Sequence, residues 1–191
     1  MGSWFSKYFA SKQGVEVQVS DVDTEISNKD VAESSDVVII SVPIDKSIGV
    51  IKKVAAYVRP NCLLTDITSV KTEQVKAMVD YSIEGVSVIG MHPMFGPFLE
   101  SIDRQVVVLT PAREADKWMS RLEWLLEDAK IIKTTPEEHD RQMAIVQGLT
   151  HFTSIVLGYA LKEFGVDINE TLKFTNPPYL ISLANTGRIL N

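Results

Sequence analysis

The sequence predicts an α/β part with a doubly wound, mostly parallel sheet over residues 1–134, followed by an all-helical part over residues 135–191. Short apolar runs, of which Asp36–Pro43 is the clearest, alternate along the first part with amphipathic stretches of helical spacing. Strands that alternate with helices are typical of a parallel sheet covered on both faces. Beyond residue 134 the strand-like runs cease, and one helical pattern extends from Pro136 to about Phe164.

The composition excludes several classes of partner. The 191 residues carry a net charge of −6 and no basic stretch long enough to hold phosphates, so we expect neither a nucleic acid nor an anionic membrane as partner. No uncharged run approaches the length that a bilayer requires. Cys62 is the only cysteine, which favours a reducing compartment and predicts a cytoplasmic protein.

The amino-terminal region has the pattern of half a dinucleotide-binding unit. A helix is expected over residues 3–12, and Val15–Val19 alternates as a strand that stops at Asp21. In the full Rossmann-type fingerprint a strand runs into G-x-G-x-x-G, and an acid about 20 residues further on binds the adenine ribose. Gly2 fits the last of these glycines and Asp21 the acid, although Asp21 is alternatively a plain turn residue. The first strand and the earlier glycines are missing, so we expect the sequence to be incomplete at its amino end.

The next strand is the best defined of the chain. A short helix over residues 28–35, with Ser27 or Asn28 as its cap, leads into the apolar run of residues 36–43. Such a run is expected of a strand buried on both faces. Pro43 is expected to end this strand, and Asp45 to cap the helix that follows.

A predicted anion-binding corner follows the strand of residues 61–64. Thr68 or Ser69 is expected to cap the next helix, whose amino end presents free N–H groups and a partial positive charge. Lys71 adds a full charge to this corner, or alternatively is a solvated lysine in a first helical turn.

A histidine loop comes after the strand-like run of residues 86–89. The sequence Gly90–Pro97 contains two prolines and two glycines, which predict an irregular loop rather than a strand or helix. His92 in this loop has the ordinary pKa of a general acid or base, although a histidine that only hydrogen-bonds across a turn is the alternative. Strands over residues 105–109 and 130–133, with an amphipathic helix between them, complete the α/β part.

The long helix of the second part carries a polar strip along an otherwise apolar surface. Thr135–Glu138 has the pattern of a capping box, and Gly165 can end the helix. The strip consists of Asp140, Gln147, Thr150, His151 and Ser154. These polar groups need partners or a ligand, and a hydrogen-bonded strip within a helix–helix contact is the alternative. The apolar remainder predicts packing against a second copy of the chain.

Two more helices are expected, over residues 166–173 and from Asn176 towards Leu190. Arg188 in the last helix can pair with a carboxylate, or can be a surface arginine near a helix end. The chain stops at Asn191 within an apolar periodic pattern, so we expect the carboxyl end to be incomplete as well.

The motifs in this order resemble those of one family. They are Asp66-x-x-Ser69-x-Lys71, Gly90–Pro97, Glu138-His139-Asp140, Gln147–Phe152 and Gly187-Arg188. On these residues the chain is similar to the prephenate dehydrogenases, including the dehydrogenase half of the enterobacterial chorismate mutase–prephenate dehydrogenases and their archaeal relatives. The resemblance implies oxidative decarboxylation of prephenate to 4-hydroxyphenylpyruvate, with NAD⁺ as hydride acceptor, on the way to tyrosine.

The resemblance also implies roles for single residues. His92 accepts the proton of the 4-hydroxyl group, which requires a neutral imidazole and predicts that activity falls at acid pH; Ser69 holds the same hydroxyl or orients His92. The implied substrate-binding residues are Arg188, Gln147, Thr150 and His151, and the implied cofactor-binding residues are Gly2, Asp21, Ser41, Val42, Pro43 and Asp66. No metal is expected. A homodimer through the helical part and feedback inhibition by tyrosine are further expectations.

Three other functions fit parts of the sequence. Arogenate dehydrogenase differs only in the amino acid side chain of its substrate. Other dehydrogenases of this architecture, such as β-hydroxyacid or imine reductases, typically rely on a lysine in the long helix, and residues 140–160 contain none. A non-catalytic nucleotide-binding or regulatory module is favoured by the shortened fingerprint and disfavoured by His92, Ser69 and Arg188.

Overall fold

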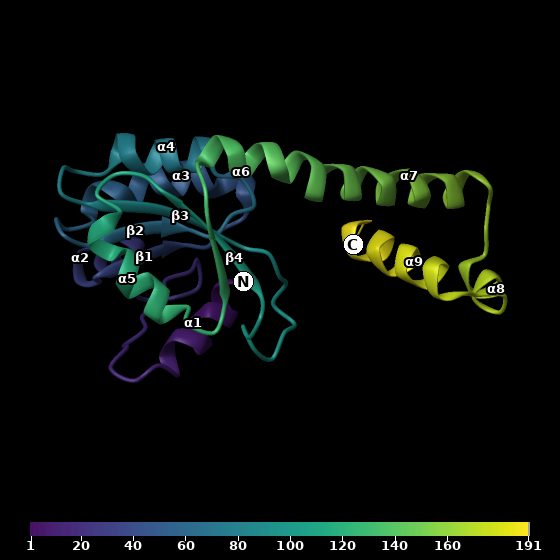
Figure 1. Ribbon diagram of the computed structural model, residues 1–191, viewed down its shortest axis with the longest axis horizontal. Helices are drawn as coiled ribbons and strands as arrows, with labels where there is room; N and C mark the ends of the chain where they lie inside the picture. Colours follow the sequence, from purple (N-terminus) through teal and green to yellow (C-terminus); the bar gives the residue numbers. More distant parts are fainter. Residues whose placement is uncertain (191) are drawn as a thin grey trace. The chain divides into compact units, whose positions relative to one another are not determined.

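The computed structural model describes residues 1–190 and divides into two compact units, Met1–Asp140 and Arg141–Asn191 (Figure 1). The elements of the first unit are α1 (Gly2–Ala10), α2 (Asn28–Ser34), β1 (Val37–Ile40), α3 (Ile44–Val54), a 3-10 turn (Ala55–Tyr57), β2 (Leu63–Asp66), α4 (Thr72–Tyr81), β3 (Ser87–Pro93), β4 (Val106–Pro111), α5 (Asp116–Leu125), β5 (Lys130–Lys133) and the start of α6 (Pro136–Met143).

The five strands form one sheet in the order β1-β2-β3-β4-β5. β1, β2 and β3 are parallel neighbours, with Val37 opposite Leu63 and Leu63 opposite Ser87. β4 runs antiparallel to β3 and parallel to β5. The predicted doubly wound, mostly parallel sheet is therefore confirmed, with one antiparallel pair at its centre.

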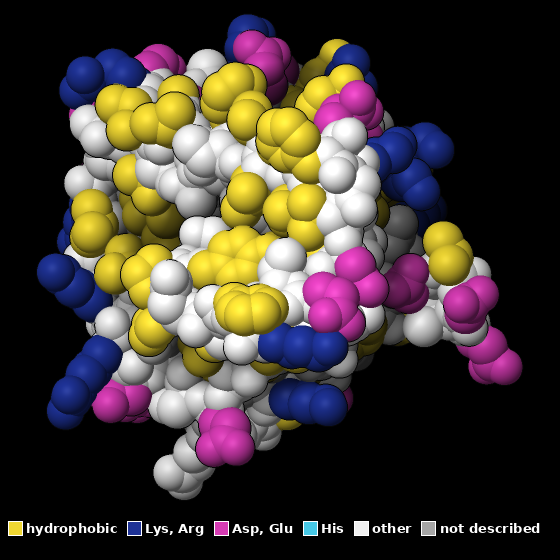
Figure 2. Space-filling view, turned by 90° about the vertical axis from the view of Figure 1, so that its right-hand side faces the viewer, with side chains coloured by type: hydrophobic (Ala, Val, Ile, Leu, Met, Phe, Trp, Pro, Cys, Tyr) yellow, Lys and Arg dark blue, Asp and Glu magenta, His cyan; other side chains and the backbone are white. Residues whose placement is uncertain are grey.

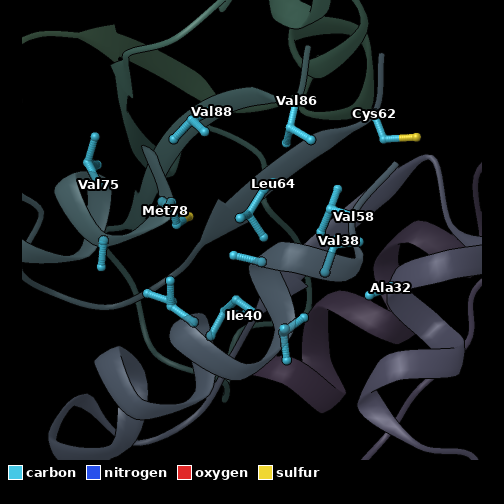
Figure 3. Packing of buried hydrophobic residues seen from close by; sticks show 14 residues of the cluster. Ala32, Val38, Ile40, Val58, Cys62, Leu64, Val75, Met78, Val86 and Val88 are labelled. Atoms are coloured by element: carbon cyan, nitrogen blue, oxygen red, sulfur yellow. The ribbon is translucent and has the colours of Figure 1, made fainter. Parts of the chain in front are cut away.

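Alternate side chains of the strands fill two separate cores. On one face, Val38, Leu64 and Val88 belong to a cluster that includes Val75 and Met78 of α4 (Figure 3). On the other face, the cluster includes Phe5 and Phe9 of α1, Leu63, Ile89 and Met91 of the strands, and Trp118 and Leu122 of α5. Helices α3 and α4 cover the first face and α1 and α5 the second (Figure 1). Burial on both faces explains why these strands are apolar almost throughout.

Two predicted features of the first unit are wrong. Val15–Val19 has no place in the sheet and forms no regular secondary structure. β1 is the edge strand on that side, and residues 14–21 line a cavity beside it instead of pairing with it, so no ladder holds this segment. Asp45 lies in the first turn of α3, whose N-cap is Pro43 and has no side-chain cap.

Several predicted helix ends are confirmed. Ser27 accepts a bond from the backbone of Asp30, whose side chain returns the bond in a complete capping box. Thr135 Oγ1 accepts a hydrogen bond of 3.2 Å from the Glu138 N–H. Gly165 ends its helix with a φ of +61°, a conformation that glycine adopts without strain.

The second unit is helical, as predicted. A π-helical segment (Ala144–Leu149) joins α6 to α7 (Thr150–Glu163), and α8 (Ile168–Leu172) and α9 (Pro177–Leu190) follow. α7 and α9 pack together, and Gly158 allows the close approach because a Cβ there would lie 3.0 Å from Thr186 Cγ2 and collide with Leu190.

Many large hydrophobic side chains of the second unit are exposed. They include Ile145, Val146, Leu149, Phe152, Ile155, Val156 and Tyr159 of the long helix, and Phe164, Phe174 and Ile181 after it. Figure 2 shows one face on which hydrophobic side chains lie in the open, with charged side chains mostly around its margin. By length and composition alone, the helix Pro136–Glu163 could cross a membrane. Only 6% of its apolar 18-residue stretch is buried.

Candidate active site

His92 lies inside a strand, which corrects the expectation of an irregular loop from Gly90 onward. β3 continues to Pro93, and His92 is opposite Val108 of the antiparallel strand β4. The ladder extends one step further, because the Met94 N–H donates to Val106 at 2.9 Å. The pairing with β4 therefore overrides the local tendency of glycine and proline, and the irregular chain begins only after Pro93.

A buried lysine crosses beneath this strand. A Cβ on Gly90 would lie 2.9 Å from Lys71 Cδ and 2.7 Å from Val75 Cγ2, so glycine leaves room for α4 and the lysine stem. The Lys71 Nζ lies 2.5 Å from Asp66 Oδ2 and donates to the Met91 carbonyl at 3.0 Å. Lys71 is fully buried, so it is neither a solvated lysine nor an exposed cation at an anion-binding corner.

Two side chains, His139 and Asp140, continue a hydrogen-bonded chain from His92. His92 Nδ1 lies 2.8 Å from His139 Nε2, and His139 Nδ1 lies 2.8 Å from Asp140 Oδ1. The Asp140 carboxylate then accepts hydrogen bonds from the backbone N–H groups of Lys71, at 2.8 Å, and Thr72, at 2.9 Å. We call His92, His139, Asp140 and these two N–H groups the histidine network.

The amino end of α4 is therefore capped from a distance. Thr68 and Ser69, the expected caps, do not fill this position, since Lys71 is the N-cap and has no side-chain cap bond of its own. The carboxylate that satisfies the free N–H groups belongs to Asp140, 69 and 68 positions further along the chain. The predicted anion-binding corner exists, but the protein's own side chain occupies it.

The electrostatics of the network favour neutral imidazoles. Burial, followed by the charges of His139 and Lys71, lowers the pKa of His92 to about 3, while Asp140 acts in the opposite direction. Burial also lowers the pKa of His139, against its bond to Asp140. Burial acts to raise the pKa of Asp140, but hydrogen bonds from Thr72, His139 and Lys71 hold it below its ordinary value. At neutral pH the network thus consists of two neutral imidazoles and one carboxylate.

Two other predicted site residues lie near the end of β2. Asp66 is fully buried and accepts bonds from Lys71, the Thr68 N–H at 3.1 Å and the Thr68 hydroxyl at 2.5 Å. Ser69 is half-buried, and no hydrogen bond of its side chain is recorded among residues 1–190. The contact that orients His92 here comes from His139, and the proposed roles of Ser69 and Asp66 stay predictions.

A cavity of about 800 Å³ lies beside β1 and is lined by five of the predicted cofactor-binding residues, Gly2, Asp21, Ser41, Val42 and Pro43. We call it the edge cavity. Segment 14–21, α1 and α5 supply most of its remaining wall. Its volume is within the range of small-molecule and cofactor sites.

Two residues of the edge cavity have features that we expect of a dinucleotide site. A Cβ on Gly2 would lie 2.7 Å from Ser41 Oγ, so glycine allows α1 to approach the end of β1 without displacing the Ser41 side chain. Asp21 is exposed, and its Oδ1 accepts the Val22 N–H at 2.7 Å. Within residues 1–190, no group of three or more His, Cys, Asp or Glu side chains is placed to hold a metal ion.

The predicted substrate-binding residues belong to the second unit. Gln147 and His151 are half-buried and Thr150 is exposed, on successive turns of the long helix. Gln147 lies in the π-helical segment, a distortion that is frequent at functional sites. Arg188 is exposed near the end of α9. Their contacts with a substrate stay predictions.

Sequence reasoning did not predict the contacts of His139 and Asp140. It placed Asp140 in a polar strip that needs partners, but it named no partner and used the Glu138-His139-Asp140 motif only for the family resemblance. His92 and His139 are 47 positions apart, and Asp140 and the Lys71 N–H are 69 apart, so local patterns do not indicate these contacts.

Comparison with known proteins now identifies the family. A model described as the prephenate dehydrogenase nucleotide-binding domain matches residues 6–133, and one described as the prephenate dehydrogenase dimerization domain matches residues 135–189. The chain belongs to the prephenate dehydrogenase family. The expectation of a nucleotide-binding part is thereby confirmed at the level of the family.

Related sequences agree with membership of the prephenate dehydrogenase family. The chain is 44% identical to a probable arogenate/prephenate dehydrogenase of Methanocaldococcus jannaschii, covering 100% of this chain and 46% of that protein. It is 34% identical to the T-protein of Haemophilus influenzae, covering 99% of this chain and 50% of that protein. The chain thus spans about half the length of the curated relatives it matches.

Solved structures show the same fold. The prephenate dehydrogenase of Aquifex aeolicus superposes with a TM-score of 0.64 at 23% identity, over 85% of this chain and 68% of that one. The arogenate dehydrogenase of Synechocystis gives a TM-score of 0.62 at 22% identity, over 84% of this chain and 61% of that one.

Proposed function

We propose that this protein oxidises and decarboxylates prephenate to 4-hydroxyphenylpyruvate, with NAD⁺ as cofactor. Residues 1–134 bind the nucleotide, and residues 135–191 supply substrate contacts and the dimer interface. The observation that carries the proposal is His92, a buried imidazole that stays neutral at physiological pH in a family that acts on a cyclohexadienol. A neutral imidazole is the group needed to accept the hydroxyl proton.

Prephenate carries a 4-hydroxyl group, a ring carboxylate and a pyruvyl carboxylate. His92 accepts the hydroxyl proton while a hydride leaves C4 and CO₂ departs from the ring, which becomes aromatic. Ser69 hydrogen-bonds the same hydroxyl group. Arg188 pairs with a carboxylate, because its planar fork matches that geometry, and Gln147, Thr150 and His151 complete the substrate contacts.

The edge cavity fits the nucleotide. Its volume is sufficient, Gly2 leaves space at the start of α1, and the exposed Asp21 carboxylate is available to the adenine ribose. NAD⁺, when bound, accepts the hydride. A carboxylate at Asp21 would repel a 2′-phosphate, which favours NAD⁺ over NADP⁺. Ser41, Val42, Pro43 and Asp66 are proposed to contact the nicotinamide side.

The exposed apolar surface of the second unit supports a homodimer. Residues 135–189 match a dimerization domain, and large apolar patches mark association surfaces. We attribute the apolar character of the helix Pro136–Glu163 to this contact rather than to a membrane. Membership of a family of biosynthetic dehydrogenases supports a cytoplasmic location.

The direct test is NADH formation by the full chain with prephenate and, separately, with arogenate. Turnover of prephenate alone, or faster turnover of prephenate, supports the proposal. Turnover of arogenate alone would assign the second candidate, which the name of the Methanocaldococcus relative also favours. If neither compound reacts, isothermal titration with NAD⁺ identifies a nucleotide-binding module by its heat of binding.

Feedback inhibition by tyrosine is a further part of the proposal. Tyrosine and the product share a phenolic ring, so both fit the pocket that binds prephenate. Steady-state assays with varied prephenate should show competition by tyrosine, and purely noncompetitive inhibition would contradict a shared pocket.

A further inference from the structure

We propose that His139 and Asp140 are positioning residues that fix the tautomer of His92, so that its Nε2 is the basic nitrogen. The catalytic meaning of this inference rests on the proposed function, but the tautomers follow from the hydrogen-bond geometry of two neutral imidazoles and one carboxylate. They can be derived one group at a time, beginning at the amino end of α4.

Asp140 starts the chain because it accepts hydrogen bonds only. Its Oδ1 takes the Lys71 N–H and its Oδ2 the Thr72 N–H. These groups and the partial positive charge of the helix end favour the ionised carboxylate. An ionised carboxylate has no proton to give, so the 2.8 Å contact with His139 must be donated by the Nδ1–H of that imidazole.

His139 then determines which nitrogen of His92 is protonated. A neutral imidazole has one N–H, and His139 uses it at Nδ1. Its Nε2 is left as an acceptor, so the 2.8 Å contact between the two rings is donated by His92 Nδ1–H. The unprotonated nitrogen of neutral His92 is therefore Nε2, which has the lone pair that a base needs.

Asp140 favours the proton that His92 gains, against burial and the charges of His139 and Lys71, which oppose it. When Nε2 takes a proton, the bond from Nδ1–H to His139 becomes charge-assisted and stronger. The negative charge of Asp140 favours the new positive charge on His92, whereas the positive charge of Lys71 opposes it. Lys71 is itself paired with Asp66. In hydrolases a carboxylate fixes the tautomer of a catalytic imidazole directly; here a second imidazole stands between the two groups.

Two substitutions of His139 distinguish a role in positioning His92 from a role in stabilising the fold alone. The carbonyl of Gln can reach the place of Nε2 and still accept from His92, whereas Asn is shorter and can replace only the Nδ1 side that faces Asp140. We expect His139→Gln to keep kcat within about threefold of the wild type and His139→Asn to lower kcat about 100-fold, the upper end for a lost orienting partner. KM for prephenate should change little in either variant.

The ¹⁵N chemical shifts of the imidazoles test the tautomers without any turnover. The chain has three histidines, so assignment requires only single substitutions. In the full wild-type chain near neutral pH, His92 and His139 should both show a protonated Nδ1 and an unprotonated Nε2. His139→Gln should keep the His92 pattern, and His139→Asn should shift His92 towards the Nε2–H form.

The possible results test the tautomer, the positioning role and the proposed function separately. A protonated Nε2 on neutral His92 in the wild type would overturn the inference. Equal losses of kcat in His139→Gln and His139→Asn, with both variants folded by circular dichroism, would overturn the positioning role. If the tautomers are as expected but the wild type turns over neither prephenate nor arogenate, the proposed function fails and the tautomer assignment stands.

Discussion

The histidine network and the edge cavity lie in the same unit but are built in opposite ways. The two imidazoles of the network are buried and Asp140 is half-buried, and these side chains are held by one another and by backbone N–H groups of α4. The edge cavity lies beside the outermost strand and is lined by segment 14–21, which forms no regular secondary structure. Under the proposed function, the proton acceptor is therefore preorganised, whereas the nucleotide site has little internal support.

The largest expected effect comes from removing the proton acceptor. His92→Asn should lower turnover of prephenate by about two to four orders of magnitude, the usual contribution of a general base. NAD⁺ affinity should stay unchanged, because His92 does not line the edge cavity. Steady-state assays and isothermal titration measure the two effects separately. Unchanged turnover would contradict the role of His92 as the base. Loss of NAD⁺ binding would contradict the separation of His92 from the nucleotide site.

Sequence reasoning was most successful where the information is local. The alternation of strands and helices, the capping box at Ser27 and the helix end at Gly165 all follow from neighbouring residues. The spacing of Gly2 and Asp21 and the family resemblance together named five residues that the structure brings to one cavity, and their contact with a cofactor stays a prediction. The first three features depend on propensity and short-range hydrogen bonds.

The histidine network was not predicted, because it depends on contacts between distant segments. Asp140 caps α4 in place of the neighbouring Thr68 or Ser69. His139 of α6 makes a hydrogen bond with His92 of β3. β3 also continues through Gly90 to Pro93 because β4 pairs with it, a contact that the local composition opposes. Segment Val15–Val19 shows the reverse, since a strand pattern without a paired neighbour forms no strand.

The stability of the chain should fall on acidification below pH 6.5. The unfolded chain binds a proton at His92 near its ordinary pKa of 6.5, whereas the folded chain binds it only near 3, so protons favour the unfolded state throughout this window. One such group costs about 1.4 kcal/mol per pH unit, and the lowered pKa of His139 acts in the same direction. Urea unfolding from pH 7 to pH 5 measures the slope.

The matched control for this slope is the double variant His92→Asn/His139→Gln, which removes both titrating groups from the network. Its unfolding free energy should depend much less on pH in the same window. An equal slope in the wild type and the double variant would mean that the histidine network is not the source of the acid sensitivity.

A smaller effect is expected at the edge cavity from Asp21. Asp21→Asn removes the negative charge while keeping the side-chain size, so the preference for NAD⁺ over NADP⁺ should fall about tenfold, the value of one hydrogen bond to a charged group. Asp23→Asn is the control, because Asp23 is exposed and does not line the cavity. Equal effects of the two substitutions would argue against a ribose contact at Asp21.

The smallest effect is expected from closing the space at Gly2. The Cβ of Gly2→Ala would meet Ser41 Oγ, and because this hydroxyl can rotate away, NAD⁺ affinity should fall only about threefold. Gly49→Ala is the control, since a Cβ at Gly49 meets nothing within 4 Å. Equal losses of NAD⁺ affinity in Gly2→Ala and Gly49→Ala would argue against a specific role for the space at Gly2.

The pH dependence of kcat/KM for prephenate tests most directly whether a buried, neutral His92 is the base. The pKa of His92, held at about 3, moves the acid fall in activity that the sequence predicts to below pH 5. The value of kcat/KM should therefore stay nearly constant from pH 8 to pH 5, over the range in which circular dichroism shows the folded chain. A fall of about tenfold per pH unit beginning near the ordinary histidine pKa of 6.5 would contradict the account.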